Sequence, residues 1–445
     1  MELQLFSEEI GRDLRWRSFL QTDLGQLYKA FPWQDLTSLF PVKKHPQGRK
    51  AWLGVQGGIG LMILKAYLGL SDRQLIERLN CDWSMQAFCG IRLKPIERIR
   101  DQDLVSRWRR YFGQHLDWRS FQAQLASHWK PHLNNTHVVL MDATCYESDV
   151  RFPTDIKLLW ESTEWVFDTL YSLCKQLRIA RPRTKYSRQQ SRYLSYARRR
   201  RKTKKLDRRM ANQLLFWLER GLGLLTDLQS QYPDVDLLHG KHYSRLQLIK
   251  QVYIQQLLRW EQNQTQIQQR IVSLAKPYLR PIKRGKETKA VEFGAKVHSI
   301  QVDGINFVEH LHFGAFNEAV RLKSAIWMHR DYFGKCKQLG GDEIYASNAN
   351  RRYCSGQGIH TCFKRKGRAS KEEDQAQVLR KAIGKERATR LEGSFGCEKQ
   401  FYGLQSIKAR TQATETVWIL FGIWTASARR IAHRIQQKQN LTKAA

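Results

Sequence analysis

The chain has 445 residues, and its 76 Lys and Arg outnumber its 41 Asp and Glu, which gives a formal net charge of +35. A hydrophobic content of 42% with 14 Trp, 16 Tyr and 19 Phe excludes a disordered polycation, because such chains are poor in aromatic residues. A surface this positive binds polyanions, so nucleic acid is the first expected partner and an anionic membrane the weaker alternative. The length predicts two or three domains.

The N-terminal third is expected to be helical. Residues 1–133 have a helical pattern throughout, in which Gly69 ends one apolar helix. Ser71 and Gln74 have the spacing of a capping box at the start of the next helix. Two short helices joined by a tight turn fit a helix-turn-helix DNA reader, and they fit any helical bundle equally well.

The first clear strand is the apolar run at residues 138–141, which is followed by Asp142. Helical periodicity then returns over residues 156–285. The apolar spacing through Ile271 and Leu274 predicts one long helix there, and the basic, proline-broken stretch 276–289 predicts a linker.

Strands resume after residue 290. Asp303-Gly304 between two β-prone runs predicts a hairpin, and Asn317 is expected to cap a helix. Residues 337–347 and 359–365 predict two more strands, and the remainder to residue 435 is expected to be helical.

This order of elements predicts a mixed α/β fold with a ribonuclease H-like core. A large helical insertion is expected to interrupt that core after its first strand, and an all-helical N-terminal domain to precede it. The expected domains are a DNA-end-binding domain at 1–133, a catalytic core at 134–157 and 286–435, and a basic helical insertion at 158–285.

Three acids are candidates for phosphoryl chemistry. In a ribonuclease H-like core, acids from different elements hold two Mg²⁺ ions about 4 Å apart, and carboxylate oxygens suit Mg²⁺. Asp142 follows the first strand, Asp342 follows the presumed fourth, and Glu392 lies on a helix with Lys399 seven residues later. Each also has a simpler explanation, as a turn or cap residue for the aspartates and as part of a solvated helix face for Glu392.

A family resemblance brings these acids together. The stretches MDAT, GDEIYASNANRRY and EGSFGCEKQFYGLQSIKAR resemble the three signature blocks of DDE insertion-sequence transposases, specifically a bacterial group with a helical N-terminal domain and a long insertion. YLGLSDRQLIERL is similar to that group's N-terminal domain, and the resemblance is weakest at 160–285. It implies a catalytic, metal-binding triad of Asp142, Asp342 and Glu392 with two Mg²⁺ ions, for which Mn²⁺ can substitute.

The related Tyr-Arg-Glu-Lys signature is matched in part. Its Glu and Lys correspond to Glu392 and Lys399, but the Arg expected four residues before the Glu meets Ala388. The Tyr position meets a lysine, and Arg387 and Arg390 are the candidates to replace the missing arginine.

Several other residues compete with these assignments. Four nearby acids are rivals of the chosen three: Asp149, Asp155, Glu343 and Glu398. Glu343 is the most serious, because adjacent residues on a strand face opposite ways and a register error would exchange it with Asp342. His298, His310 and His312 could suggest a zinc site, although the polar side of a half-buried hairpin explains them more simply.

Basic side chains are expected to contact DNA. Nine of the fifteen residues 196–210 are Lys or Arg, and tyrosines precede them; a solvated helix face or a disordered arm is the alternative. Backbone contacts of this kind are salt-dependent and largely blind to sequence. Lys408 and Arg410 could touch phosphate near the cleavage point or be helix-end cations. The predicted DNA contacts are Arg198, Arg199, Arg200, Arg201, Lys204, Lys205, Lys399, Lys408 and Arg410.

The sequence thus predicts a transposase that binds double-stranded DNA at the ends of its element, cuts there with metal-activated water and joins the 3′ hydroxyl to target DNA. The resemblance implies a homodimer on DNA and a bacterial, nucleoid-associated location. The lack of Cys-x-x-Cys pairs and the short apolar window 417–428 favour a cytoplasmic protein without a membrane span. The alternatives are an inactive transposase-derived DNA-binding protein and a metal-dependent nuclease of the same core.

Overall fold

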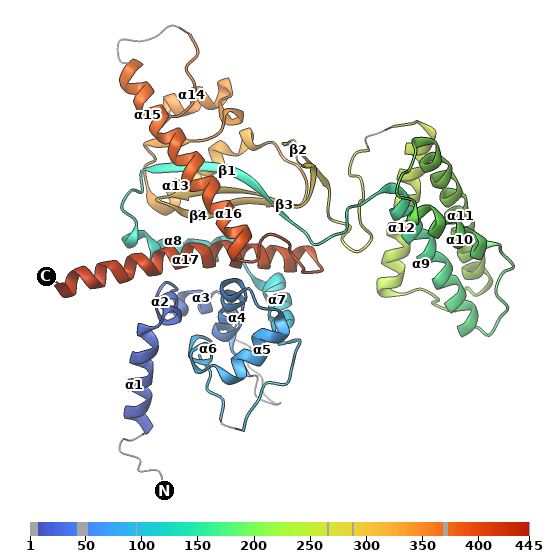
Figure 1. Cartoon of the computed structure of the whole chain (residues 1–445), viewed down its shortest axis with the longest axis horizontal. Coiled ribbons are helices and arrows are strands. Elements are labelled where there is room, and N and C mark those ends of the chain that lie inside the picture. The colour runs from blue at the N-terminus through green and yellow to red at the C-terminus, as the bar shows by residue number, and fades with distance from the viewer. Residues whose placement is uncertain are drawn as a thin grey trace. The chain divides into compact units, whose positions relative to one another are not determined.

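A computed structural model describes residues 8–41, 52–94, 96–264, 267–286, 289–367 and 373–444. The fold is mixed α/β, as predicted, and the chain divides into two compact units (Figure 1). Unit 1 comprises Met1–Asp149 and Gly294–Ala445, and unit 2 comprises Val150–Phe293. The sequence predicts the insertion at 158–285, which lies within unit 2.

The first part of unit 1 is helical. Its elements are α1 (Glu8–Gln21), α2 (Asp23–Lys29), α3 (Trp33–Ser38), α4 (Val55–Leu68), α5 (Asp72–Cys81), α6 (Trp83–Phe88), α7 (Leu104–His115), α8 (Trp118–Trp129) and the 3₁₀ turn η1 (Lys130–His132).

The α4–α5 connection follows the local signals of its sequence. Gly69 ends α4 in the left-handed conformation at φ 64°, which a residue without Cβ adopts without strain. Ser71 and Gln74 form the predicted capping box at the start of α5. Both predictions are confirmed, while the DNA-reading role of this helix pair stays a prediction.

A mixed sheet forms the second part of unit 1. Its strands are β1 (Val138–Glu147), β3 (Lys289–Val302, which begins in unit 2), β4 (Ile305–His312), β5 (Gln338–Gly340) and β6 (His360–Thr361). β3 pairs antiparallel with both β1 and β4, whereas β5 pairs parallel with β1 and with β6. The predicted hairpin is confirmed, because Asp303 and Gly304 both have positive φ between β3 and β4.

Helices and short turns complete unit 1. They are η2 (Glu318–Arg321), α13 (Leu322–Phe333), η3 (Glu343–Tyr345), α14 (Asn348–Gly356), α15 (Glu373–Glu386), the π-helical turn η4 (Arg387–Leu391), α16 (Glu392–Phe401) and α17 (Gln412–Ala444). Asn317 caps η2, which leads into α13, so its predicted capping role is confirmed.

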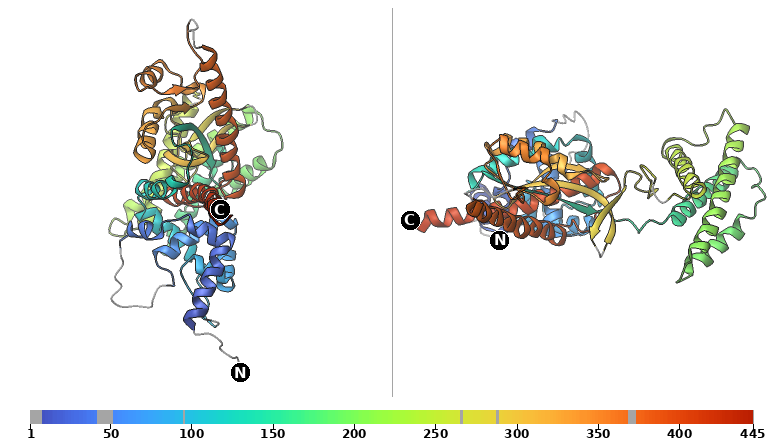
Figure 2. Two further views of the ribbon diagram at one scale, coloured as in Figure 1. Left: turned by 90° about the vertical axis from the view of Figure 1, so that its left-hand side faces the viewer. Right: turned by 90° about the horizontal axis from the view of Figure 1, so that it is seen from above.

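The long helix α17 joins the two parts of unit 1. It packs against α4 and α7 on one side and against β4 on the other, and Figures 1 and 2 show it between the N-terminal helices and the strands. The predicted burial of residues 417–428 is confirmed, since Ile419, Ile423 and Trp424 are fully buried. On α8, the Gln122 amide exchanges two hydrogen bonds with the backbone of Val308 in β4, at 2.7 and 2.9 Å.

Unit 2 is built around four helices: α9 (Asp155–Gln176), α10 (Tyr186–Arg198), α11 (Lys204–Gln231) and α12 (Gly240–Glu261). Their apolar faces enclose a core in which Phe167, Leu214, Leu218 and Ile249 are fully buried. Amphipathic helices of this length are stabilised mainly by such packing.

Two predictions for the end of unit 2 are wrong. The expected long helix stops at Glu261, and Asn263 and Gln269 have positive φ, which a continuous helix cannot contain. Ile271 and Leu274 are still buried, but in irregular chain. The expected linker contains the strand β2 (Pro281–Lys286), which pairs antiparallel with the first residues of β3.

Candidate active site

Parallel pairing of β1 with β5 sets the positions of the two aspartates. The register pairs Val138 with Gln338 and Leu140 with Gly340. The pairing ends there, so Asp342 follows β5 by two residues while Asp142 lies within β1, and the negative charge of Asp342 acts on the Asp142 carboxyl. Asp342 is exposed just beyond β5, where its carboxylate accepts a hydrogen bond from the Glu343 N–H at 2.7 Å.

Asp142 lies in a partly buried, electronegative environment. Its side chain is 17% exposed, and one carboxylate oxygen accepts the Ala143 N–H at 2.8 Å. Burial raises the pKa of Asp142 to about 6, and the negative charges of Glu318 and Asp342 act in the same direction. The Ala143 hydrogen bond and the Arg387 charge only partly oppose this.

A π-helical turn brings Arg387 and Glu392 to the same side. The Glu392 N–H donates to the carbonyl of Arg387, five residues earlier, across η4. The Arg387 guanidinium Nη1 lies 2.8 Å from Asp142 Oδ2 and 3.1 Å from Glu392 Oε1. Arg390 instead forms an exposed ion pair with Glu386 at 2.9 Å. Arg387 therefore connects the first and third predicted acids.

Apolar packing explains why η4 lies over Asp142. Leu140 forms a small buried cluster with Ile383 of α15, Leu391 of η4 and Phe395 of α16. Because side chains two residues apart on a strand face the same way, Asp142 points toward the same helices as Leu140.

The four rival acids lie in different environments. Glu343 is exposed and forms an ion pair with Lys364. Asp155 belongs to unit 2, where Gln256, Arg259 and Arg270 bind it. Asp149 is exposed after β1, and Glu398 is buried.

Glu398 anchors α16 to the sheet. Its carboxylate accepts hydrogen bonds from the Tyr146 hydroxyl on β1 and from the Asn306 amide on β4, the latter at 2.6 Å. The same Asn306 amide binds Ser394 at 2.7 Å, and Gln301 on β3 binds Asn306 at 2.7 Å. This buried network fixes the helix that begins at Glu392.

The ionisation of Glu398 is expected to make folding pH-dependent. Burial raises the pKa of Glu398 to about 7, against a usual value of 4.5. A raised acid pKa stabilises the fold fully below pH 4.5, and this contribution of about 3 kcal/mol is lost as the pH rises through 7. We expect Glu398→Gln to remove about 2–3 kcal/mol of the difference in unfolding free energy between pH 5 and pH 8, measured by urea unfolding. Glu386→Gln, at an exposed site, is the control and should leave that difference unchanged.

Of the three candidate histidines, His298 and His312 form hydrogen bonds with protein groups, and His310 packs against the Phe316 ring. His298 is fully buried; its Nδ1 lies 2.9 Å from Glu309 and its Nε2 lies 2.8 Å from the Tyr345 hydroxyl. The Tyr345 hydroxyl also contacts Glu318, at 3.4 Å. Over the described ranges, no group of three or more His, Cys, Asp or Glu side chains has an arrangement that could hold a metal ion. Among these described residues, neither the three histidines nor the three predicted acids form such a group.

The donor chemistry of the acids nevertheless fits a divalent cation. Asp142, Asp342 and Glu392 offer carboxylate oxygens, the ligands that Mg²⁺ prefers. The Asp142 carboxyl lies beside two further negative charges, those of Asp342 and Glu318, so a cation is favoured there.

The remaining predicted contacts of unit 1 lie on α16 and just after it. The Lys399 ammonium lies 5.8 Å from the centre of the Tyr146 ring, which places it along β1 from Asp142. Lys408 and Arg410 are exposed in the segment between α16 and α17.

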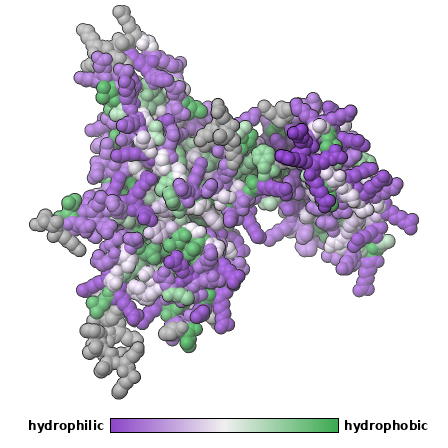
Figure 3. Space-filling view, in the orientation of Figure 1, coloured by the Kyte–Doolittle hydropathy of each residue, from purple (hydrophilic) through white to green (hydrophobic). Residues whose placement is uncertain are grey.

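The basic residues 198–205, which we call the basic tract, join α10 to α11 in unit 2. All six predicted contacts in it, Arg198, Arg199, Arg200, Arg201, Lys204 and Lys205, are exposed. None of the six forms an ion pair with a residue that the structure describes. Hydrophilic side chains cover most of the face of unit 2 that Figure 3 shows.

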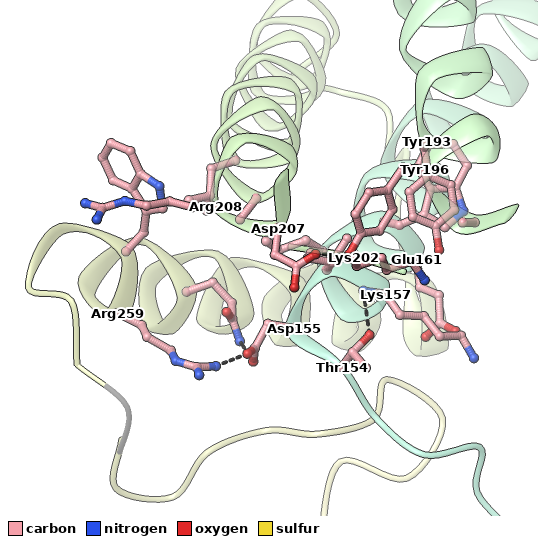
Figure 4. A pocket seen from close by; sticks show the side chains of 18 of the residues that line it. Thr154, Asp155, Lys157, Glu161, Tyr193, Tyr196, Lys202, Asp207, Arg208 and Arg259 are labelled. Carbon is pink, nitrogen blue, oxygen red and sulfur yellow. Dashed lines mark hydrogen bonds and ion pairs between the residues drawn. The ribbon is translucent and has the colours of Figure 1, made fainter. Parts of the chain in front are cut away.

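The basic tract borders a cavity of about 1070 Å³ within unit 2. Lys202 and Lys204 belong to both, and Lys202 lies 4.9 Å from the centre of the Tyr196 ring. Figure 4 shows Tyr193 and Tyr196 near Lys202 on one side and Arg208 on another. Aromatic and cationic side chains therefore lie together at the start of α11.

Sequence reasoning left out one residue of the site and did not decide another. Glu318 has no local signal in the sequence, because only the β3–β4 hairpin and the following turn bring its charge toward Asp142. Arg387 was one of two candidates for the missing arginine, and the π turn η4 decides between them, since it adds one residue to the turn before Glu392. Clustered carboxylates with a raised pKa are a recognised signal of functional sites, but only coordinates give it.

Comparison with protein families gives a match in the N-terminal part of the chain. Residues 12–111, which span most of α1 through α7, match a family model described as Transposase domain (DUF772). No curated protein and no solved structure matches the chain. In the described part of the chain, no helix is long and apolar enough to span a membrane. The match at residues 12–111 supports a transposase family for this chain.

Proposed function

We propose that this protein is the transposase of an insertion sequence, with a ribonuclease H-like core that cleaves the ends of the element and joins them to target DNA. The observation that carries the proposal is the Arg387 bridge between Asp142 and Glu392. It brings together two acids from distant parts of the chain, as the family resemblance requires. The transposase-domain match lies in a different part of the chain and supports the same conclusion independently.

The acids would hold the metal. Asp142, Asp342 and Glu392 are the proposed ligands of two Mg²⁺ ions, with Mn²⁺ as a substitute. Bound divalent ions supply Lewis acidity that activates the attacking oxygen and stabilises the leaving one. The mixed sheet with helices on it supports a ribonuclease H-like core; Asp142 lies in β1, and Asp342 follows the parallel strand β5.

Other side chains would bind the DNA. Lys399, Lys408 and Arg410 follow Glu392 and are proposed to contact phosphates close to the acids. The basic tract is proposed to bind the DNA backbone through unit 2. Bringing two element ends together requires at least two copies of the chain, so we propose a homodimer on DNA.

A single assay tests the reaction class. The full chain is incubated with Mg²⁺, a labelled duplex that carries one end of the element, and a target plasmid. A transposase gives both cut ends and joined product, and Asp142→Asn abolishes both while the affinity for the duplex, measured by fluorescence anisotropy, is retained.

Each alternative gives a different result. Cut ends without joined product would indicate a nuclease. Duplex binding without any cleavage by the wild-type protein would indicate an inactive, transposase-derived DNA-binding protein. Activity that survives in Asp142→Asn would contradict the proposed acids.

The basic tract should determine the salt dependence of binding. Log K falls as log salt rises, and each lost phosphate contact makes this negative slope less steep by about 0.9 for duplex DNA. We expect Arg199→Gln with Arg200→Gln to make the slope less steep by about 2, with little dependence on DNA sequence. The matched control, Arg220→Gln with Lys241→Gln, also removes two exposed cations from unit 2 and should leave the slope unchanged. Equal slopes in the two double variants would show that the basic tract does not contact the DNA.

A further inference from the structure

One guanidinium nitrogen of Arg387 forms ion pairs with two of the proposed metal ligands. Arg387 Nη1 is within 3.1 Å of carboxylate oxygens of both Asp142 and Glu392. Of the residues that the structure describes, Arg387 is the only cation that forms an ion pair with either acid. The Arg387 and Asp142 side chains are both 17% exposed, so their contact is shielded from solvent, whereas Glu392 is 53% exposed.

The backbone holds Arg387 in that position. In the π turn η4, the hydrogen bond from Glu392 N–H to Arg387 C=O places the two residues one above the other. A regular α-helix would instead align Glu392 with residue 388, which is alanine. A π turn within an α-helix is a frequent feature of functional sites.

The charges around Asp142 indicate which acids Arg387 neutralises. Four carboxylates belong to this region, those of Asp142, Asp342, Glu318 and Glu392, and Glu318 already pairs with Lys296 at 2.7 Å. Arg387 is therefore the cation that balances Asp142 and Glu392. A second cation at the same oxygens would meet its repulsion at close range.

We propose that Arg387 is an internal counter-ion that competes with divalent cations for Asp142 and Glu392, and that DNA releases the competition. This inference rests on the proposed function, because it takes those acids as metal ligands. Arginine binds phosphate in a bidentate manner and so has an alternative partner once DNA arrives. Metal binding and DNA binding then strengthen each other, because the ion pairs of Arg387 with Asp142 and Glu392 oppose both.

The test measures Mn²⁺ affinity directly. Free Mn²⁺ is followed by electron paramagnetic resonance with the full chain and without DNA. Arg387→Gln is expected to bind Mn²⁺ at least tenfold more tightly than the wild type. Arg390→Gln, three residues away in an exposed ion pair, is the matched control and should bind within twofold of the wild type. Adding duplex DNA should tighten Mn²⁺ binding by the wild type and have little effect on Arg387→Gln.

The contrary outcomes separate this proposal from the function on which it rests. If Arg387→Gln binds Mn²⁺ no more tightly than the wild type, the counter-ion role is wrong. If Asp142→Asn with Arg387→Gln binds Mn²⁺ as tightly as Arg387→Gln alone, the ions do not bind at these acids, and the proposed function fails as well. Circular dichroism checks folding; should Arg387→Gln fail to fold, Arg387→Met, which retains an unbranched aliphatic chain, is measured in its place.

Discussion

Replacing Asp342 by asparagine is expected to lower the rate of DNA joining by about a thousandfold. The proposed function makes Asp342 a metal ligand; such a ligand contributes several kcal/mol to stabilising the transition state, and each 1.36 kcal/mol corresponds to a factor of ten in rate. The fold should be retained, because Asp342 caps η3 and asparagine caps a helix about as well as aspartate. The measurement is the rate of joined product with Mg²⁺ and a labelled element end.

The neighbouring acid provides the control. Glu343 is adjacent to Asp342, also carries a carboxylate and forms an exposed ion pair with Lys364. We expect Glu343→Gln to join DNA within about threefold of the wild-type rate, since exposed ion pairs contribute little. A large loss in Glu343→Gln with normal activity in Asp342→Asn would mean that the residues after β5 have exchanged roles.

The second large effect concerns stability. Glu309→Gln is expected to lower the free energy of unfolding by about 3–5 kcal/mol, because removing one partner of a buried ion pair leaves the other charge uncompensated. Glu309 is 4% exposed, and its carboxylate binds His298 at 2.9 Å and Arg321 at 3.1 Å. Urea unfolding followed by tryptophan fluorescence measures the change at pH 7.

The pH dependence of that loss gives a further check. Burial by itself would raise the pKa of Glu309, but hydrogen bonds from His298 and Arg321 outweigh it and lower the pKa to about 2. A lowered acid pKa stabilises the fold above pH 4.5, and the contribution disappears as the pH falls through 2. The wild type and Glu309→Gln should therefore converge in stability toward acidic pH. Glu77→Gln, in an exposed pair with Arg73, should change stability by no more than about 0.5 kcal/mol. A comparable loss in both variants would contradict the importance of burial.

The elements that sequence predicted well depend on short-range chemistry. The Gly69 helix end, the Ser71–Gln74 capping box and the Asp303-Gly304 hairpin each involve residues within a few positions of one another. A cap or a turn lowers the energy of one local conformation whatever packs on it, so its signal can be read directly.

The wrong predictions concern segments whose local sequence pattern is compatible with two different structures. Ile271 and Leu274 have the apolar spacing of a helix and are buried, but irregular chain buries them as well. Long-range contacts hold this segment, among them Arg270 with Asp155 at 2.6 Å and the Ile271 N–H with Gln255 at 3.1 Å. Likewise β2 forms only because the start of β3 supplies its hydrogen-bonding partners.

By itself, the sequence determined the charge, the helical start of the chain, the first residues of β1 and the three acids worth testing, although β1 continues past Asp142 to Glu147. Only the tertiary structure decided that Arg387 joins Asp142 to Glu392, that Glu318 lies near Asp142, and that Glu343 turns to Lys364. The reason is that electrostatic energies depend on distance and burial. Residues 245 positions apart acquire both only when strands pair and helices pack.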